Sequence, residues 1–124
     1  MTLEMLPMRF AVCKLKDFTR ADPALPFCFC ARTEAECSWV GPEEDVPENV
    51  LQREDGWRAF RVAGQLDFSL VGILSQISGV LARARVGIFA ISTFDTDYIL
   101  TKEENWQTAL DALREAGFAL KELL

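Results

Sequence analysis

The second half of this sequence places two helical patterns on either side of a pair of strand patterns, and this order limits the fold more than any other feature. Residues 69–85 and 102–116 carry apolar side chains at helical spacing, so each is predicted to be a helix with one apolar stripe. The first stripe is Leu70, Ile73, Leu74, Ile77, Val80, Leu81 and Ala84, and the second is Trp106, Ala109, Leu110 and Leu113. Each stripe needs a sheet or another helix to cover it.

The expected ends of the helices have their own signals. Ser69 is a suitable N-cap for the first helix. Thr101 and Glu104 have the spacing of a capping box for the second helix, and Gly117 is a suitable stop.

Strand patterns surround these helices. They cover residues 57–66, 87–94, 97–102 and 118–123. The order strand, helix, strand, strand, helix, strand predicts an α+β, ferredoxin-like unit, with an antiparallel sheet and both helices on one face.

The first half shows three strand patterns, at residues 8–18, 27–33 and 37–41, and no long helix. Residues 42–56 are acidic, carry Pro42 and Pro47, and are interpreted as a connection with at most one helical turn. We therefore expect two domains, an abbreviated unit over residues 1–56 and a complete unit over 57–124. A sheet without helices should pack against the second half or against a second copy of the chain.

Composition narrows the class of protein. Half of the 124 residues are hydrophobic, and no apolar run reaches the ~20 residues of a membrane helix. The first ten residues lack the pattern of a signal peptide, which favours a cytoplasmic protein without membrane contact. The net charge of −6 argues against nucleic acid as a partner.

The chain contains four cysteines and no histidine, which bears on metal sites and catalysis. Without histidine, most nucleophile–base pairs and most zinc sites are excluded. We interpret Cys13, Cys28, Cys30 and Cys37 as small core residues, and predict no catalytic residue, no metal and no cofactor. A low-pKa Cys28 or Cys30 would instead indicate a small enzyme.

The segment "AISTFDTDYIL", residues 90–100, reads as a hairpin with its turn at Asp95 and Thr96. Its tip is rich in oxygen atoms, from Ser92, Thr93, Asp95, Thr96 and Asp97, which are also ordinary turn formers. Yet the tip has no glycine, which two-residue hairpins usually prefer. We therefore expect a binding role beside the turn, with carboxylates accepting from an ammonium group.

The loop before the first helix offers the opposite chemistry. Its first turn, residues 70–72, has no acidic side chain, so its N–H groups could receive an anion, and Gly72 would allow close approach. The alternative is a plain Ser69 cap with solvated N–H groups. An anion site and a carboxylate site together suit a zwitterion, and a free amino acid is the obvious candidate.

Residues 66–105, "LDFSLVGIL" to "STFDTDYILTKEEN", resemble the ACT-domain family. They are most similar to the branch with the cytosolic arginine sensors and small bacterial ACT proteins. Residues 27–47 resemble the truncated first unit of that branch. The resemblance implies a tandem pair of ACT units that regulate rather than catalyse, with an amino acid bound between units.

The resemblance also implies ligand-binding residues. They are Thr93, Phe94 and Asp97 on the hairpin, Asp67, Phe68, Ser69, Leu70, Val71 and Gly72 on the facing loop, and Ser38 and Trp39 on the abbreviated unit. Trp39 replaces the usual aliphatic residue, so the identity of the amino acid is left open. Asp95 and Thr96 are expected to remain turn residues.

The short chain should form a homodimer to rebuild the longer arrangement of the sensors, and this leaves room for a regulated protein partner. The alternative is a ligand-free module that oligomerises or docks on another protein, because uncovered sheet surface favours association.

Overall fold

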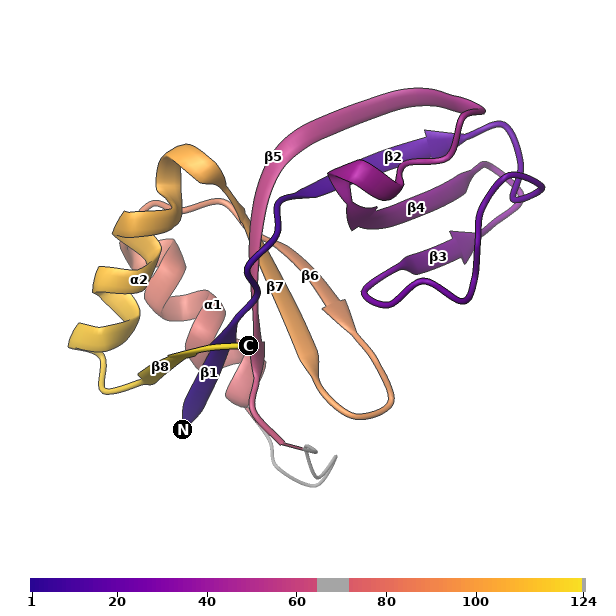
Figure 1. Ribbon diagram of the computed structural model, residues 1–124. Coiled ribbons are helices and arrows are strands. Elements are labelled where there is room, and N and C mark those ends of the chain that lie inside the picture. Colours follow the sequence, from indigo (N-terminus) through magenta and orange to yellow (C-terminus); the bar gives the residue numbers. More distant parts are fainter. Residues whose placement is uncertain (65–71, 124) are drawn as a thin grey trace. The chain divides into compact units, whose positions relative to one another are not determined.

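The computed structural model describes residues 1–64 and 72–123, and it divides the chain into two compact units (Figure 1). Unit 1 comprises Met1–Pro7 and Arg58–Leu124, and unit 2 comprises Met8–Trp57. The long strand β5 (Val50–Val62) begins in unit 2 and ends in unit 1. The N-terminal residues thus belong with the C-terminal half of the chain, whereas we expected them in the first domain.

Unit 1 is an α+β unit of the expected ferredoxin-like kind. Its strands lie in the order β6 (Phe89–Ser92), β7 (Asp97–Lys102), the end of β5, β1 (Thr2–Met5) and β8 (Ala119–Glu122). Its helices are α1 (Ile73–Arg83) and α2 (Trp106–Glu115), with the short 3₁₀ helix η2 (Glu103–Asn105) before α2. The predicted order of strands and helices from residue 57 onward is confirmed.

Strand β1 was not predicted. It lies between β5 and β8, antiparallel to β5 and parallel to β8. The sheet is therefore mixed, whereas we expected an antiparallel sheet. Only Leu3 of this four-residue strand is fully buried. Its alternation of polar and apolar residues covers only four positions, Thr2 to Met5, which is the shortest length that suggests a strand.

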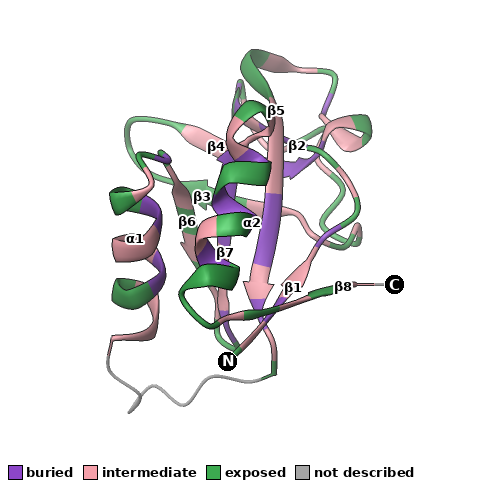
Figure 2. Ribbon diagram, turned by 90° about the vertical axis from the view of Figure 1, so that its left-hand side faces the viewer, coloured by how far each residue is buried: buried purple, intermediate pink, exposed green. Residues whose placement is uncertain are grey.

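Both helices cover one face of the unit 1 sheet. Figure 2 shows the buried side of α1 turned toward the strands and its outer side exposed. The core contains Leu3, Phe60, Val62, Ile77, Leu81, Val86, Ile99, Trp106, Ala109, Leu110 and Leu113. The second predicted stripe is therefore buried in full, while Leu70 of the first stripe lies outside the described residues. No helix in the described part of the chain is long and apolar enough to cross a membrane.

Of the three predicted helix-end signals, one lies outside the described residues, one is wrong and one is confirmed. Helix α1 begins at Ile73, and Ser69, its expected cap, lies outside the described residues. The capping box before α2 is wrong: α2 has no side-chain cap, and the Thr101 hydroxyl donates to the Lys102 carbonyl oxygen. Thr101 is still part of strand β7. The stop at Gly117 is confirmed, since its φ of 100° suits glycine.

Unit 2 is an antiparallel sheet in the order β3 (Phe29–Arg32), β4 (Cys37–Pro42), β2 (Phe10–Leu15) and the start of β5. The expected helical turn is η1 (Glu43–Asp45). The rest of the predicted connection is wrong, because β5 already starts at Val50 and pairs with β2. Residues 51–55 are exposed and mostly polar, and such a strand has no apolar pattern to reveal it.

The two units share a strand order. The hairpin β3–β4 and η1 recur 60 residues later as the hairpin β6–β7 and η2. Unit 2, which is described throughout, has no α-helix. Loop side chains cover its core residues instead; that core is Ala11, Cys13, Leu15 and Trp39. We therefore propose that unit 2 is an abbreviated copy of unit 1.

Candidate functional site

The β6–β7 hairpin is closed by Thr93. Its backbone N–H donates to the Thr96 carbonyl oxygen at 2.8 Å, and its hydroxyl donates to the same oxygen at 3.0 Å. The Thr96 N–H in turn donates to the Thr93 hydroxyl oxygen at 3.3 Å. The turn is therefore centred on Phe94 and Asp95, not on Asp95 and Thr96 as predicted. Neither central residue has a positive φ, so the missing glycine has a structural explanation.

Asp97 lies immediately below this tip, at the start of β7. It is the cross-strand neighbour of Ser92, whose hydroxyl donates to Asp97 Oδ1 at 2.5 Å. An ionised carboxylate has about four acceptor positions on its two oxygens. The bond to Ser92 orients the carboxylate and leaves capacity for a charged donor from a ligand.

Phe94 and Thr93 differ in what they can offer. Phe94 projects at the tip with 76% of its surface exposed, which is unusual for an aromatic side chain. The Thr93 hydroxyl already serves as donor and acceptor in the turn. The tip therefore offers an apolar surface at Phe94 beside a carboxylate at Asp97.

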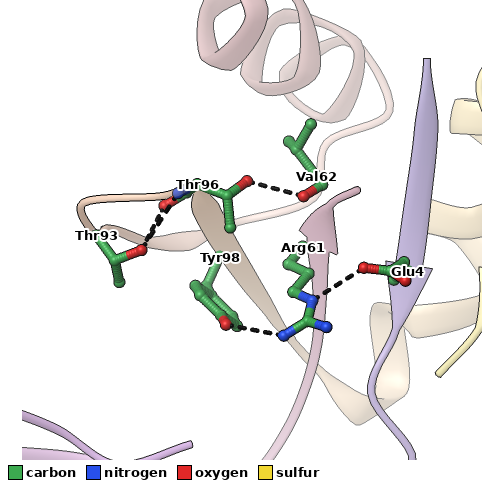
Figure 3. Close-up of polar contacts among 6 residues, drawn as sticks. All are labelled: Glu4, Arg61, Val62, Thr93, Thr96 and Tyr98. Atoms are coloured by element: carbon green, nitrogen blue, oxygen red, sulfur yellow. Dashed lines mark hydrogen bonds and ion pairs between the residues drawn. The ribbon is translucent and has the colours of Figure 1, made fainter. Parts of the chain in front are cut away.

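Thr96 ties the tip to the end of strand β5. It is buried, and its hydroxyl donates to the Val62 carbonyl oxygen at 2.8 Å (Figure 3). We predicted only a turn role for Thr96. Nothing in the sequence around Thr96 distinguishes this bond from a local turn contact, because the partner lies 34 residues away.

The bond from Thr96 to Val62 brings the hairpin tip close to the chain that enters the expected facing loop. Asp67, Phe68, Ser69, Leu70 and Val71 of that loop lie outside the described residues. Gly72 is described, and its φ of 93° is one that glycine adopts without strain. It occupies the N-cap of α1, where it has no side chain to cap the helix, and no acidic residue lies in the first turn.

A polar network crosses the sheet of unit 1 next to the hairpin (Figure 3). Arg61 on β5 donates through Nε to Glu4 at 3.0 Å and through a terminal nitrogen to the Tyr98 hydroxyl at 3.1 Å. Burial lowers the pKa of Arg61, but these bonds more than offset it, so the pKa lies above its ordinary value and the group stays charged. The network was missed because Glu4 belongs to the unpredicted strand β1.

Ser38 and Trp39 lie on β4 in unit 2. Ser38 pairs with Lys14 on one side and Ala31 on the other. Trp39 is only 1% exposed, and its ring lies over Gly41, where an added Cβ would come within 2.6 Å of a ring carbon. Trp39 is therefore a core side chain of unit 2, and Gly41 provides the space for it.

The cysteines all lie in unit 2 and are free thiols. Burial raises the pKa of the Cys13 and Cys28 thiols to about 11, and it also raises the pKa of Cys30. Thiols with raised pKa values are poor nucleophiles at neutral pH. Among the described residues, no three acidic or cysteine side chains come together as a metal site.

Comparison with known proteins identifies the family. A family model for the ACT domain matches residues 52–115. The chain belongs to the ACT-domain family. The match begins in β5 and ends at the last residue of α2, so it includes the β6–β7 hairpin.

The sequences of two related proteins match about half of this ACT protein. The rat protein named cytosolic arginine sensor for mTORC1 subunit 1 is 41% identical over 69 residues, which is 53% of this chain and 21% of the sensor. The human protein of the same name is 39% identical over 66 residues, 51% of this chain and 20% of the sensor. The chain thus spans about a fifth of the length of these relatives.

Solved structures extend the similarity over the whole chain. Protein Atu0741 from Agrobacterium tumefaciens is 28% identical with a TM-score of 0.84, covering 99% of this chain and 93% of that one. The regulatory subunit of aspartate kinase from Thermus thermophilus is 7% identical with a TM-score of 0.64, covering 94% and 97%. At such low identity, the second similarity concerns the fold alone.

Proposed function

We propose that this ACT protein is a non-enzymatic regulatory module that binds a free amino acid at an interface between ACT units. The observation that carries the proposal is the Asp97 carboxylate, held by Ser92 at 2.5 Å directly below an exposed aromatic tip. A carboxylate of this kind is a suitable acceptor for an α-ammonium group, and charge-assisted hydrogen bonds are the stronger ones.

The carboxylate of the amino acid would bind at the start of α1. Gly72 gives this helix end no capping side chain, and its first turn lacks acidic residues, so the N–H groups and the helix dipole favour an anion. The bond between Thr96 and Val62 supports this pairing, because it fixes the hairpin next to the chain that leads to α1. Residues 67–71 complete the loop in this proposal.

The residues divide into direct and supporting roles. In the proposed site, Asp97 contacts the ammonium group, Phe94 covers the apolar part of the ligand, and Gly72 lies at the carboxylate. Thr93 supports the site by closing the turn rather than by contacting the ligand. Ser38 remains a proposed ligand contact on unit 2, and Trp39 belongs to the core of that unit.

The relatives support an amino acid as the ligand. The rat and human proteins are named as cytosolic sensors of arginine, and their similarity to this chain covers about half of it. The name also favours a cytoplasmic location. The name alone does not make arginine the ligand of this chain, because the match corresponds to about a fifth of each sensor. In this proposal, a second copy of the chain supplies the further ACT units.

Thermal-shift and calorimetric measurements against each of the free amino acids test the proposal. We expect one amino acid or a small group to stabilise the protein, by about 2.7 kcal/mol at 100 times the dissociation constant. Asp97→Ala should abolish this stabilisation. Asp95→Ala, which removes the other carboxylate of the same tip, is the matched control and should retain it.

Two outcomes would overturn the proposal. One is that no amino acid stabilises the wild-type protein at millimolar concentration. The other is that Asp97→Ala binds as tightly as the wild type. Light scattering with and without the amino acid then tests the proposed interface, since a site between copies predicts that the ligand favours the dimer.

The second candidate is a ligand-free interaction module. Strand β3 favours it, because among the described residues β3 pairs with β4 alone, and Cys30, Ala31 and Arg32 are exposed. An open strand edge is a surface on which another chain can add a strand. A strictly monomeric mass at micromolar concentration would argue against this candidate.

A further inference from the structure

Unit 1 contains a cavity of about 360 Å³ that shares no residue with the proposed amino-acid site. It lies between α2 and the ends of β1 and β8. On strand β5, its lining residue Arg58 is four residues before Val62, where the hairpin tip is attached. Four residues of strand span roughly 13 Å, which separates the cavity from the tip. The volume lies in the range of small-ligand sites.

The walls of the cavity combine an apolar floor with charged ends. Trp106, Leu110 and Arg114 line it from one face of α2, at spacings of four residues. Leu6 and Leu123 add apolar surface from the segments after β1 and β8. The lining therefore suits a ligand with an apolar chain.

The charges of the lining favour an anion. The lining includes two arginines, Arg58 and Arg114, and one glutamate, Glu122. Each guanidinium also has an acidic neighbour, Glu103 at 3.7 Å from Arg58 and Asp111 at 3.6 Å from Arg114. Both contacts are ion pairs that offset part of the positive charge, but their distances are longer than a hydrogen bond.

Arg58 is held in place without using its donors fully. Its guanidinium carbon lies 5.0 Å from the centre of the Trp106 ring, a cation–π contact that fixes its orientation. Its Nε is buried and has no hydrogen-bond partner among the described residues. A buried donor without an acceptor is unfavourable, and a ligand carboxylate could relieve this by bonding to the guanidinium edge.

We propose that this cavity is a second ligand site, which binds a small carboxylate with an apolar chain. Arg58 is the anion partner, Trp106 and Leu110 contact the chain, and the half-exposed Arg114 attracts the anion at the rim. This proposal does not depend on the amino-acid site, since the two share no residue.

Titration of the 124-residue protein with hexanoate, followed by NMR of the Trp106 indole N–H, tests the proposal. Hexan-1-ol and hexylamine have the same chain and serve as the uncharged and cationic controls. We expect a saturable shift with hexanoate at millimolar concentration, and at least about tenfold weaker binding of both controls. No saturable shift up to about 20 mM, or equal binding of hexan-1-ol or hexylamine, would overturn the proposal.

Two variants test the roles of residues that line the cavity. Arg58→Gln keeps a long polar side chain without the charge and should weaken hexanoate binding by about tenfold or more. Leu123→Trp fills the cavity from the end of the chain beyond β8 and should block binding even if Arg58→Gln folds poorly. Arg83→Gln, on the exposed side of α1, is the control and should bind like the wild type. Wild-type binding by both test variants would refute the assignment.

Asp97→Ala separates this proposal from the proposed function. It should lose amino-acid binding and keep hexanoate binding. Loss of hexanoate binding in Asp97→Ala would contradict a second, independent site, whereas failure of hexanoate to bind the wild type leaves the amino-acid site untouched.

Discussion

In both hairpins of this protein a threonine closes the tip. In unit 2, the N–H groups of Ala35 and Glu36 donate to the Thr33 hydroxyl oxygen at 3.1 and 3.2 Å, and the Thr33 N–H donates to the Glu36 carbonyl oxygen. Thr93 plays the same part in unit 1. The closure thus requires one hydroxyl at one position and leaves the other tip residues free to vary.

The residues around the two tips have diverged. Below the unit 2 tip, the Arg32 guanidinium donates to the Cys37 sulfur at 3.9 Å, where unit 1 has Ser92 and Asp97. Unit 2 therefore presents a guanidinium group and a thiol, and unit 1 presents a carboxylate. An ammonium group is expected at the unit 1 hairpin and not at its counterpart.

The largest expected effect concerns the buried and exposed aromatic residues of the two hairpins. Trp39→Ala should lower the free energy of unfolding by about 3–5 kcal/mol, because it leaves a cavity in the core of unit 2. Phe94→Ala should change it by less than about 0.5 kcal/mol, since the side chain is largely exposed. Urea unfolding followed by circular dichroism measures both. Equal losses of unfolding free energy would show that Phe94 is packed in the folded protein rather than available to a ligand.

The second largest effect is expected from exchanging Asp97 and Cys37, which occupy the same position in the two hairpins. Asp97→Cys gives unit 1 the residue of unit 2 and should weaken amino-acid binding by about tenfold to 150-fold, since hydrogen bonds to charged groups contribute about 1.5–3 kcal/mol. Cys37→Asp, the reverse change in unit 2, should leave that affinity unchanged. Calorimetry with the amino acid found by screening compares them. An effect of Cys37→Asp as large as that of Asp97→Cys would remove the distinction between the hairpins.

The attachment of the unit 1 tip predicts a smaller change in stability. Thr96→Val keeps the shape of the side chain but removes the bond to the Val62 carbonyl oxygen, which should cost about 1–3 kcal/mol. Glu36→Gln alters the corresponding residue of unit 2, which is exposed, and should cost less than about 0.5 kcal/mol. Urea midpoints at constant slope check this, and a wild-type midpoint for Thr96→Val would contradict the attachment.

The thiols of unit 2 predict a dependence on alkaline pH. Burial raises the pKa of Cys13 from 9.0 to about 11, so the folded state favours the neutral thiol. This stabilisation is complete below about pH 9 and is lost between about pH 9 and 11, by roughly 1.4 kcal/mol per pH unit. Unfolding of the wild type and of Cys13→Ala at pH 8 and pH 10 measures it. An identical decline in both proteins would contradict the shift.

The helices and the hairpin were predictable from local patterns. The stripes of α1 and α2 repeat at helical spacing, and the β7 strand was predicted with its observed bounds, Asp97–Lys102. The family resemblance rested on this same part of the chain, and the family match covers it. Periodicity suffices here because each element buries one face against a single core.

Strand β1 and the first part of β5 were not predictable in this way. Strand β1 has only two apolar positions, Leu3 and Met5, and residues 51–55 of β5 are exposed, so neither segment has an apolar pattern of useful length. Both are strands because a partner is in place to bond their backbones, β5 for one and β2 for the other. Hydrogen bonding between distant segments leaves no mark on composition.

The sequence by itself determined the order of helices and strands from residue 57 onward, the apolar stripes, and the presence of carboxylates at the hairpin. The tertiary structure decided which of the predicted site residues are available to a ligand. Thr93 is used in the turn, Thr96 is attached to Val62, Trp39 is buried, and Asp97 is left beside an exposed Phe94. The reason is physical: a side chain's type fixes which bonds it can make, but only the fold fixes which of those bonds are already made.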